Sequence, residues 1–229
     1  MSRLLAAAPL LLLSFIAGCG SDLATACCTT GPASLRVVNA FTSPVDVLID
    51  GQVVIGSLAP GAIGTAAPAS GSHTLALVPT SSGASAFQSI TTTTGALRTI
   101  AAVRRSDGTV AGAVLDDTNS VVPAGATKVR VLHLAANVGT LQVYSTQPDY
   151  QELVSWQFPF DYQPEPTSAS APFYQSTVGS WEVRVWETPA DESGWANAPV
   201  RVVIPLGSGE KKTVLILDKP GGGVRVELL

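Results

Sequence analysis

The sequence predicts an all-β fold, arranged as two tandem antiparallel β-sandwich domains. Three observations favour this fold. Glycine and proline make up 37 of the 229 residues while only 13% are charged, a composition typical of short strands and turns. No run of ten or more residues carries apolar side chains at the 3.6-residue spacing of an amphipathic helix. Four short stretches, moreover, occur twice in the same order.

These repeated stretches indicate two copies of one domain. LRVVNA (35–40) is similar to VRVLHL (129–134), VDVL (45–48) to LQVY (141–144), GSHTLALV (71–78) to GSWEVRVW (179–186), and TIAAV (99–103) to TVLIL (213–217). The offset between the copies grows from 94 to 114 residues along the chain. The second copy therefore carries additional residues, 12 of them between its second and third repeated stretches.

The repeat sets the expected domain boundaries. We expect a first β-sandwich at residues 33–119, a linker at 120–125 and a second β-sandwich at 126–229, with an aromatic insert at 147–177. Each copy offers about seven strand-like runs. WEVRVW (181–186) alternates as a half-buried strand does, whereas TVLILD (213–218) is the continuous apolar run of a central strand. Turn signals such as IDGQ (49–52), SDGT (106–109) and PGGG (220–223) separate the runs.

The first 18 residues are expected to be a signal peptide. Arg3 is followed by an uncharged apolar stretch, residues 4–16, that is too short to span a membrane as a helix. Ile16-Ala17-Gly18-Cys19 resembles a bacterial lipobox, which implies that Cys19 becomes the acylated N-terminus and anchors the protein to a membrane. The alternative is an ordinary secretory leader with a coincidental cysteine. Gly20 follows Cys19, so we expect the cell envelope, at the outer membrane if the host has one.

Two more cysteines follow in the expected tether, residues 19–32. Cys27 is a rival acylation site, but Asp22 would place a charge beside the apolar stretch. A disulfide between Cys27 and Cys28 would be strained, because adjacent Cα atoms lie only ~3.8 Å apart. No cysteine follows residue 28, so the folded part is expected to hold without disulfides.

Charge and motif content argue against several functions. Without residues 1–18 the chain has 12 Lys and Arg against 17 Asp and Glu, a balance that disfavours nucleic acid as a partner. His73 and His133 are the only histidines, one in each copy, and both are expected to be half-buried structural residues. The acidic pairs Asp116-Asp117 and Asp191-Glu192 are candidates for calcium, but such pairs are usually solvated. We expect no enzyme, no metal and no cofactor, although scattered carboxylates leave a glycosidase open.

Aromatic side chains concentrate in the second copy. All four Trp and all four Tyr lie between residues 144 and 195. Strand parity places Trp181 in the core and Trp186 on the outward face. The candidate binding patch comprises Trp156, Phe158, Phe160, Tyr162, Phe173, Tyr174 and Trp186. These rings either extend the core of the second sandwich or form a face for a protein or a sugar.

The first repeated stretches are similar to a known family. LRVVNAFTSPVDVLIDG (35–51) and VRVLHLAANVGTLQVY (129–144) resemble the opening of the bacterial family called domain of unknown function 4397, whose repeats begin with an Arg-Val-Val-His-like strand and a Val-Asp-Val-Tyr-like strand ending in Asp-Gly. Copy one has Asn39 where histidine is usual, and copy two lacks the Asp-Gly turn. The resemblance implies immunoglobulin-like sandwiches in exported proteins, often lipoproteins, and it implies no catalytic residues.

Two functions follow as expectations. The first is a non-enzymatic envelope lipoprotein, anchored to the membrane through its lipid, whose sandwiches bind an unknown protein or serve as a structural module. The alternative is a glycan-binding module that uses the aromatic surface of the second domain.

Overall fold

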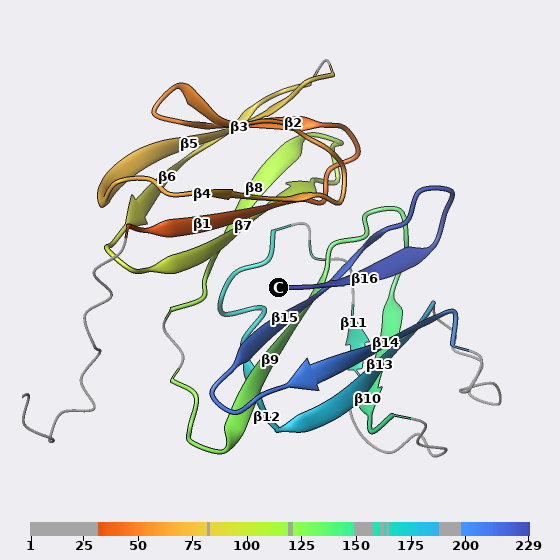
Figure 1. Ribbon diagram of the computed structural model, residues 1–229. Helices are drawn as coiled ribbons and strands as arrows, with labels where there is room; N and C mark the ends of the chain where they lie inside the picture. Colours follow the sequence, from red (N-terminus) through yellow and green to blue (C-terminus); the bar gives the residue numbers. More distant parts are fainter. Residues whose placement is uncertain are drawn as a thin grey trace, which may run out of the picture.

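The computed structural model describes residues 32–81, 83–118, 121–148, 163, 165–187 and 198–229, and the backbone of residues 158–160 (Figure 1). Cys19, Cys27 and Cys28 lie outside these residues. The described residues form sixteen strands and no helix, so the predicted all-β fold is confirmed.

The first sandwich consists of two four-stranded sheets. Its strands are β1 (Ser34–Asn39), β2 (Val45–Ile49), β3 (Gln52–Leu58), β4 (Ile63–Ala66), β5 (Gly71–Pro79), β6 (Ala86–Thr92), β7 (Leu97–Arg104) and β8 (Val110–Asp116). One sheet has the order β4-β1-β7-β8 and the other β3-β2-β5-β6. Side chains of alternating parity, among them Leu35, Val47, Leu75 and Ile100, fill the space between the sheets.

The second sandwich has the same arrangement. Its strands are β9 (Ala126–His133), β10 (Leu141–Thr146), β11 (Phe158–Phe160), β12 (Tyr174–Thr177), β13 (Gly179–Glu187), β14 (Val200–Leu206), β15 (Lys211–Asp218) and β16 (Val224–Leu228). The sheet orders are β12-β9-β15-β16 and β11-β10-β13-β14. Each strand thus takes the place of the strand eight before it, and the parallel pair β1–β7 recurs as β9–β15. The described part of each sandwich has eight strands, one more than the sequence suggested.

The Asp-Gly turn forms as its residues require. Asp50 and Gly51 join β2 to β3 with φ angles of 50° and 80°. Two consecutive residues with positive φ are the signature of a two-residue type I′ hairpin, which matches the twist of the strands it joins. Asp is one of the residue types that tolerate this conformation, and the carboxylate of Asp50 also accepts the backbone N–H of Thr74, 2.8 Å away.

The two sandwiches pack against each other through one sheet of each. The contact layer, here called the seam, joins the outer face of the β4-β1-β7-β8 sheet to the outer face of the β12-β9-β15-β16 sheet. Four positions of β1, β7 and the residue after β1 recur at the equivalent positions of the second copy. The first copy supplies Val38, Ala40, Ala101, Val103, Ala111, Ala113 and Leu115, and the second Leu132, Leu134, Leu215 and Leu217, with Ala171 added. Small side chains of one copy therefore face leucines of the other, which lets the sheets approach closely.

The seam explains why the central strands are apolar on both faces. The five consecutive residues Thr213–Leu217 of β15 are buried, with Val214 and Ile216 in the core of their own sandwich and Leu215 and Leu217 in the seam. The same holds for β7, whose residues Thr99–Val103 are buried. The molecule is a stack of four sheets with three apolar layers between them.

Candidate functional site

The structure places three of the seven rings predicted for a binding patch. Trp156 and Tyr162 lie outside the described residues, and the side chains of Phe158 and Phe160 do as well. Phe173, Tyr174 and Trp186 are described. They lie in three different surroundings, so these three rings do not form one surface.

Trp186 is buried, and its predicted exposure is wrong. Only 6% of the residue is accessible, and its ring meets that of Tyr144 edge to face at 5.1 Å between centroids. Glu182 and Arg184, on the same face of β13, are equally buried and bind each other at 2.6 Å. Strand parity correctly assigned Trp186 to the face opposite the sandwich core. The predicted exposure of Trp186 is wrong because the side chains on that face of β13 are shielded from solvent as well.

Phe173 points into a charged cluster at the edge of the seam. Its ring lies 4.4 Å from the guanidinium carbon of Arg130, a cation–π contact, and 6.0 Å from Nζ of Lys211. Arg130 donates to Asp117 Oδ1 at 2.6 Å, and Arg36 donates to the other carboxylate oxygen at 2.9 Å. Thr99 also donates to that oxygen, at 2.5 Å.

Asp117 is therefore neither a solvated turn residue nor a free calcium ligand. Its side chain is 3% exposed, and both of its oxygens are occupied by donors from the two sandwiches. Arg36 and Arg130 hold equivalent positions in the two copies, so the one carboxylate of Asp117 binds the corresponding arginine of each sandwich. Burial lowers the pKa of the Arg130 guanidinium, and attraction by Asp117 opposes this effect.

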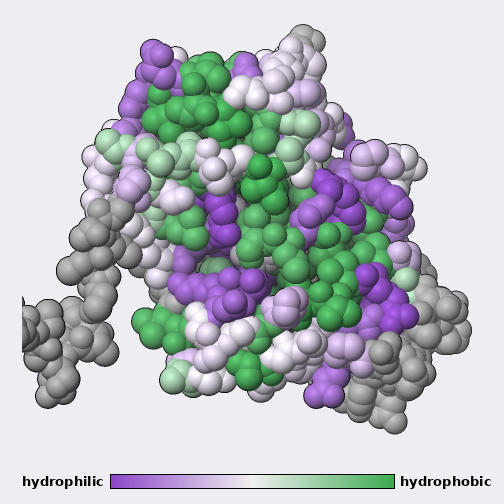
Figure 2. Space-filling model, viewed as in Figure 1, coloured by the Kyte–Doolittle hydropathy of each residue, from purple (hydrophilic) through white to green (hydrophobic). Residues whose placement is uncertain are grey.

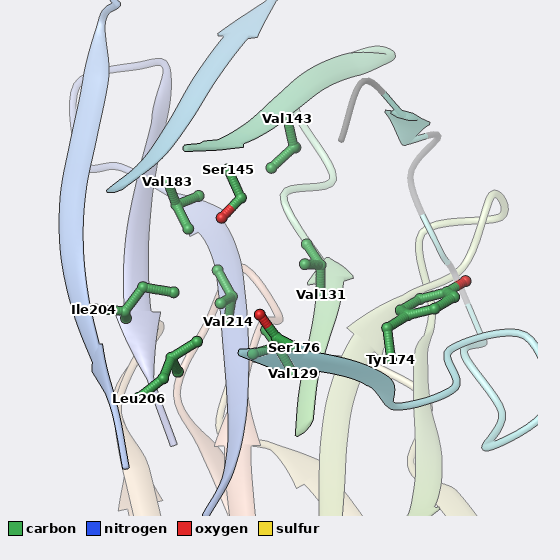
Figure 3. A pocket seen from close by; sticks show the side chains of 10 residues that line it. All are labelled: Val129, Val131, Val143, Ser145, Tyr174, Ser176, Val183, Ile204, Leu206 and Val214. Atoms are coloured by element: carbon green, nitrogen blue, oxygen red, sulfur yellow. The ribbon is translucent and has the colours of Figure 1, made fainter. Parts of the chain in front are cut away.

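Tyr174 lies at the edge of a small cavity inside the second sandwich and is 47% exposed. Valines from both sheets, together with Ser145, Ser176, Ile204 and Leu206, surround the cavity (Figure 3). Its volume of about 20 Å³ is little more than one water needs and far below the ~300–1,000 Å³ of small-molecule sites. The cavity is thus an incompletely filled core and not a ligand pocket.

The cause of the cavity is visible in the first sandwich. Strand pairing matches Ile49–Leu75 with Ser145–Val183, and Val37–Ile100 with Val131–Val214. Leu35 likewise corresponds to Val129. Four large side chains of the first core are therefore replaced by smaller ones in the second.

Both histidines form hydrogen bonds within the protein, and His133 is buried more deeply than the half-buried position expected for it. Nδ1 of His73 lies 2.7 Å from Asp50 Oδ2, and Nε2 lies 2.9 Å from the carbonyl of Ala69. Both neighbours only accept hydrogen bonds, so the ring satisfies both when it carries two protons. These bonds raise the pKa of His73, the one to Asp50 most of all, and His73 in turn lowers the pKa of Asp50. His133, fully buried, bonds the carbonyl of Gly139 at 2.9 Å and ties down the loop after β9.

Two further surfaces formed by described residues are open to solvent. In Figure 2 a hydrophobic surface lies over the first sandwich at the top of the view, where β3 exposes Val53 and Val54. A bulge at Ser57, whose N–H binds Asp46 at 2.6 Å, interrupts this edge strand and limits pairing along it. The second surface is a cleft of about 310 Å³ between the sandwiches, lined by the loop after β1 and the turn between β15 and β16.

Metal and membrane features are absent from the part of the chain that the structure describes. No three His, Cys, Asp or Glu side chains there gather closely enough to hold a metal ion. Nor do these residues contain a helix with the length and hydrophobicity to cross a membrane.

Comparison with known proteins identifies a family for the first half of the chain. Residues 33–144 match the family described as "Domain of unknown function (DUF4397)". No curated protein matches significantly. Among solved structures, a DUF3823 family protein from Bacteroides ovatus ATCC 8483 is similar at 8% identity, covering 77% of this chain and 97% of its own, with a TM-score of 0.22. At that score no structural or functional argument follows from it.

The Asp117 cluster gives a first prediction. Asp117→Asn should lower the free energy of unfolding by about 3–5 kcal/mol, because it leaves two guanidinium groups without their buried counter-charge. Urea denaturation measures the change. Asp107→Asn, in an exposed turn, is the matched control and should change stability by less than about 1 kcal/mol. Equal effects of the two substitutions would contradict the assigned role.

The cavity in the second sandwich gives a second prediction. Val214→Ile restores the residue that the first sandwich has at this position and adds one methylene group, about what the cavity of about 20 Å³ can accept, so it should stabilise the protein by about 0.5–1 kcal/mol. Ser89→Ile, on the exposed face of β6, adds the same side chain without a cavity to fill. Thermal unfolding of both variants tests the effect. A loss of stability in Val214→Ile would contradict the reading of this space as an incompletely filled core.

The His73–Asp50 pair gives a third prediction. NMR titration should find the pKa of His73 above 6.5, and Asp50→Asn should lower it. Since the folded-state pKa is raised, the stabilisation by this pair is complete below the unfolded pKa of histidine and is lost as pH rises through the folded pKa. On the acid side it is lost as Asp50 becomes protonated. An unshifted His73 would contradict the hydrogen-bond geometry.

Proposed function

Since residues 33–144 belong to the DUF4397 family, whose function is undefined, we propose a function from the architecture: the protein is a non-enzymatic lipoprotein of the cell envelope. Its two sandwiches act as one rigid module that presents binding surfaces at a distance from the membrane. The site of residence is the outer membrane where the host has one.

The packing of the seam is the observation that carries this proposal. Twelve buried side chains and the Asp117 cluster join the sandwiches, so that they move as one body and not as beads on a linker. Such a body suits a spacer or a scaffold. It suits a hinged enzyme poorly, because hinge closure requires the domains to separate.

The chemistry of the described residues supports a non-catalytic role. A general base needs a ring nitrogen or carboxylate that is free to take a proton from substrate. Both ring nitrogens of His73 are already bonded within the protein, and Asp117 is enclosed by arginine. The buried Glu182 binds Arg184 and Arg201.

The leader supplies the anchor in this proposal. Cys19 ends a lipobox-like stretch, and the 14 residues from Gly20 to Ala33 separate it from the first strand. At ~3.3–3.6 Å per residue this tether reaches at most about 50 Å. Two or more acyl chains on Cys19 provide stable attachment where one chain does not.

Anchoring is tested by substitution. Cys19→Ser should move the protein from the membrane fraction to the soluble fraction or leave an uncleaved precursor, and mass spectrometry should find acyl chains on Cys19 of the unchanged protein. Cys27→Ser is the control and should leave the protein membrane-bound. A mature N-terminus other than acylated Cys19 would refute the anchor.

A further inference from the structure

The two ends of the seam differ, although the two sandwiches are alike. One end is covered by a stretch of the second copy, Gln163 and residues 165–171, here called the seam segment. In Figure 1 it runs between the sandwiches just before β12, to the left of the marker for the C-terminus. It is part of the residues that the second copy has in excess of the first.

The seam segment is held by both sandwiches. The backbone N–H of Gln163 donates to the carbonyl of His133 at 3.0 Å, and Glu165 forms an ion pair with Arg105 in the turn after β7. Ser168 Oγ accepts the N–H of Asp116 at 2.9 Å, and Ala171 is buried in the seam. A proline-containing stretch with one carboxylate thus fits between the loop after β9, the first strand of the second sandwich, and the turn after β7, the seventh strand of the first.

The opposite end of the seam has the equivalent loop and turn, after β1 and after β15, but no segment of the described residues lies between them. Asn39 is equivalent to His133, and Lys219 is equivalent to Arg105 by the offsets of the repeat. Between them lies the cleft of about 310 Å³, with Phe41, Thr42, Pro60 and Pro220 in its walls. In Figure 1 this is where the β15–β16 turn approaches the loop after β1, to the right of the C-terminus.

The cleft is open because the first copy lacks the extra residues. There the N–H of Gly61 binds the carbonyl of Asn39, as Gln163 binds that of His133, and the chain enters β4 two residues later. At this end the described residues of the first copy do not run across the seam as the seam segment does, and the contact of this turn with the second sandwich is a 2.8 Å hydrogen bond from Arg225 of β16 to the carbonyl of Gly61. Lys219 is exposed and forms no ion pair with the described residues, while the neighbouring Asp218 is already bound by the N–H groups of Ala136 and Asn137.

We propose that this cleft binds an extended, proline-containing peptide stretch with an acidic side chain, supplied by another protein. The peptide lies against Phe41, Pro60 and Pro220, and its carboxylate pairs with Lys219 as Glu165 pairs with Arg105. The volume agrees with a site for a few residues at a domain interface. This proposal specifies the class of partner for the proposed binding module. It does not depend on lipid anchoring, so either the peptide site or the lipid anchor can be disproved without affecting the other.

The test uses a peptide with the sequence of residues 163–172, QPEPTSASAP, carrying a fluorescent label, and the full-length protein in mild detergent. Fluorescence anisotropy should show saturable binding. Lys219→Glu should weaken it about five- to tenfold, and a peptide with glutamine in place of its glutamate should bind about two- to fivefold more weakly, because an exposed ion pair contributes at most about 1 kcal/mol. Thr42→Trp, which fills the cleft, should abolish binding even if Lys219→Glu perturbs the fold.

Two control variants separate the cleft from other sites. Lys212→Glu removes a positive charge that is paired with Glu210 and lies outside the cleft, and it should leave the affinity unchanged. Arg105→Glu disturbs the site of the seam segment and should not weaken binding. The proposal is overturned if the peptide fails to bind at millimolar concentration. It is overturned equally if Arg105→Glu, and not Lys219→Glu, reduces the affinity.

Discussion

Asp117 accepts hydrogen bonds from two guanidinium groups that occupy the same position in the two copies. Leaving a carboxylate in a buried setting costs several kcal/mol unless donors surround it, and here those donors come from both sandwiches. The sandwiches must therefore stay in one relative placement for the charge to be satisfied. The close approach of the Ala-rich and Leu-rich faces, the course of the seam segment and the shape of the cleft all depend on that placement.

The two sandwiches have the same strand order, but equivalent positions have different roles in them. The first core is filled by Ile49, Leu75 and Ile100, whereas the second has Ser145, Val183 and Val214 and a small cavity. Conversely, the second copy has a segment that crosses the seam and the first has a short turn. The second core therefore has smaller side chains at these three positions, while the extra residues of the second copy provide the differences between the two ends of the molecule.

Local patterns predicted the elements, and distant contacts decided what the patterns missed. The Asp50-Gly51 turn, the strands and the apolar run 213–218 follow from turn chemistry and periodicity, which act over a few residues. The alternation in β13 assigned Trp181 and Trp186 to opposite faces but carried no information on what covers each face. Asp117 resembled a solvated acid because its partner Arg36 lies 81 residues away. Only the continuous apolar run TVLILD (213–218) indicated the seam, because a strand with apolar side chains on both faces must be buried on both.

The pairing of small with large side chains across the seam also restricts how separate chains associate. Two first sandwiches brought together by this face would set Ala40 and Ala101 against their own copies and leave voids, and two second sandwiches would crowd Leu134 and Leu215. Like faces from neighbouring molecules therefore form poor complexes, while the unlike face is always present on the same chain. Tandem repeats are prone to misassembly when they are concentrated. In this protein the difference in side-chain size favours the pairing of unlike faces, and the unlike face of the same chain is the nearest one.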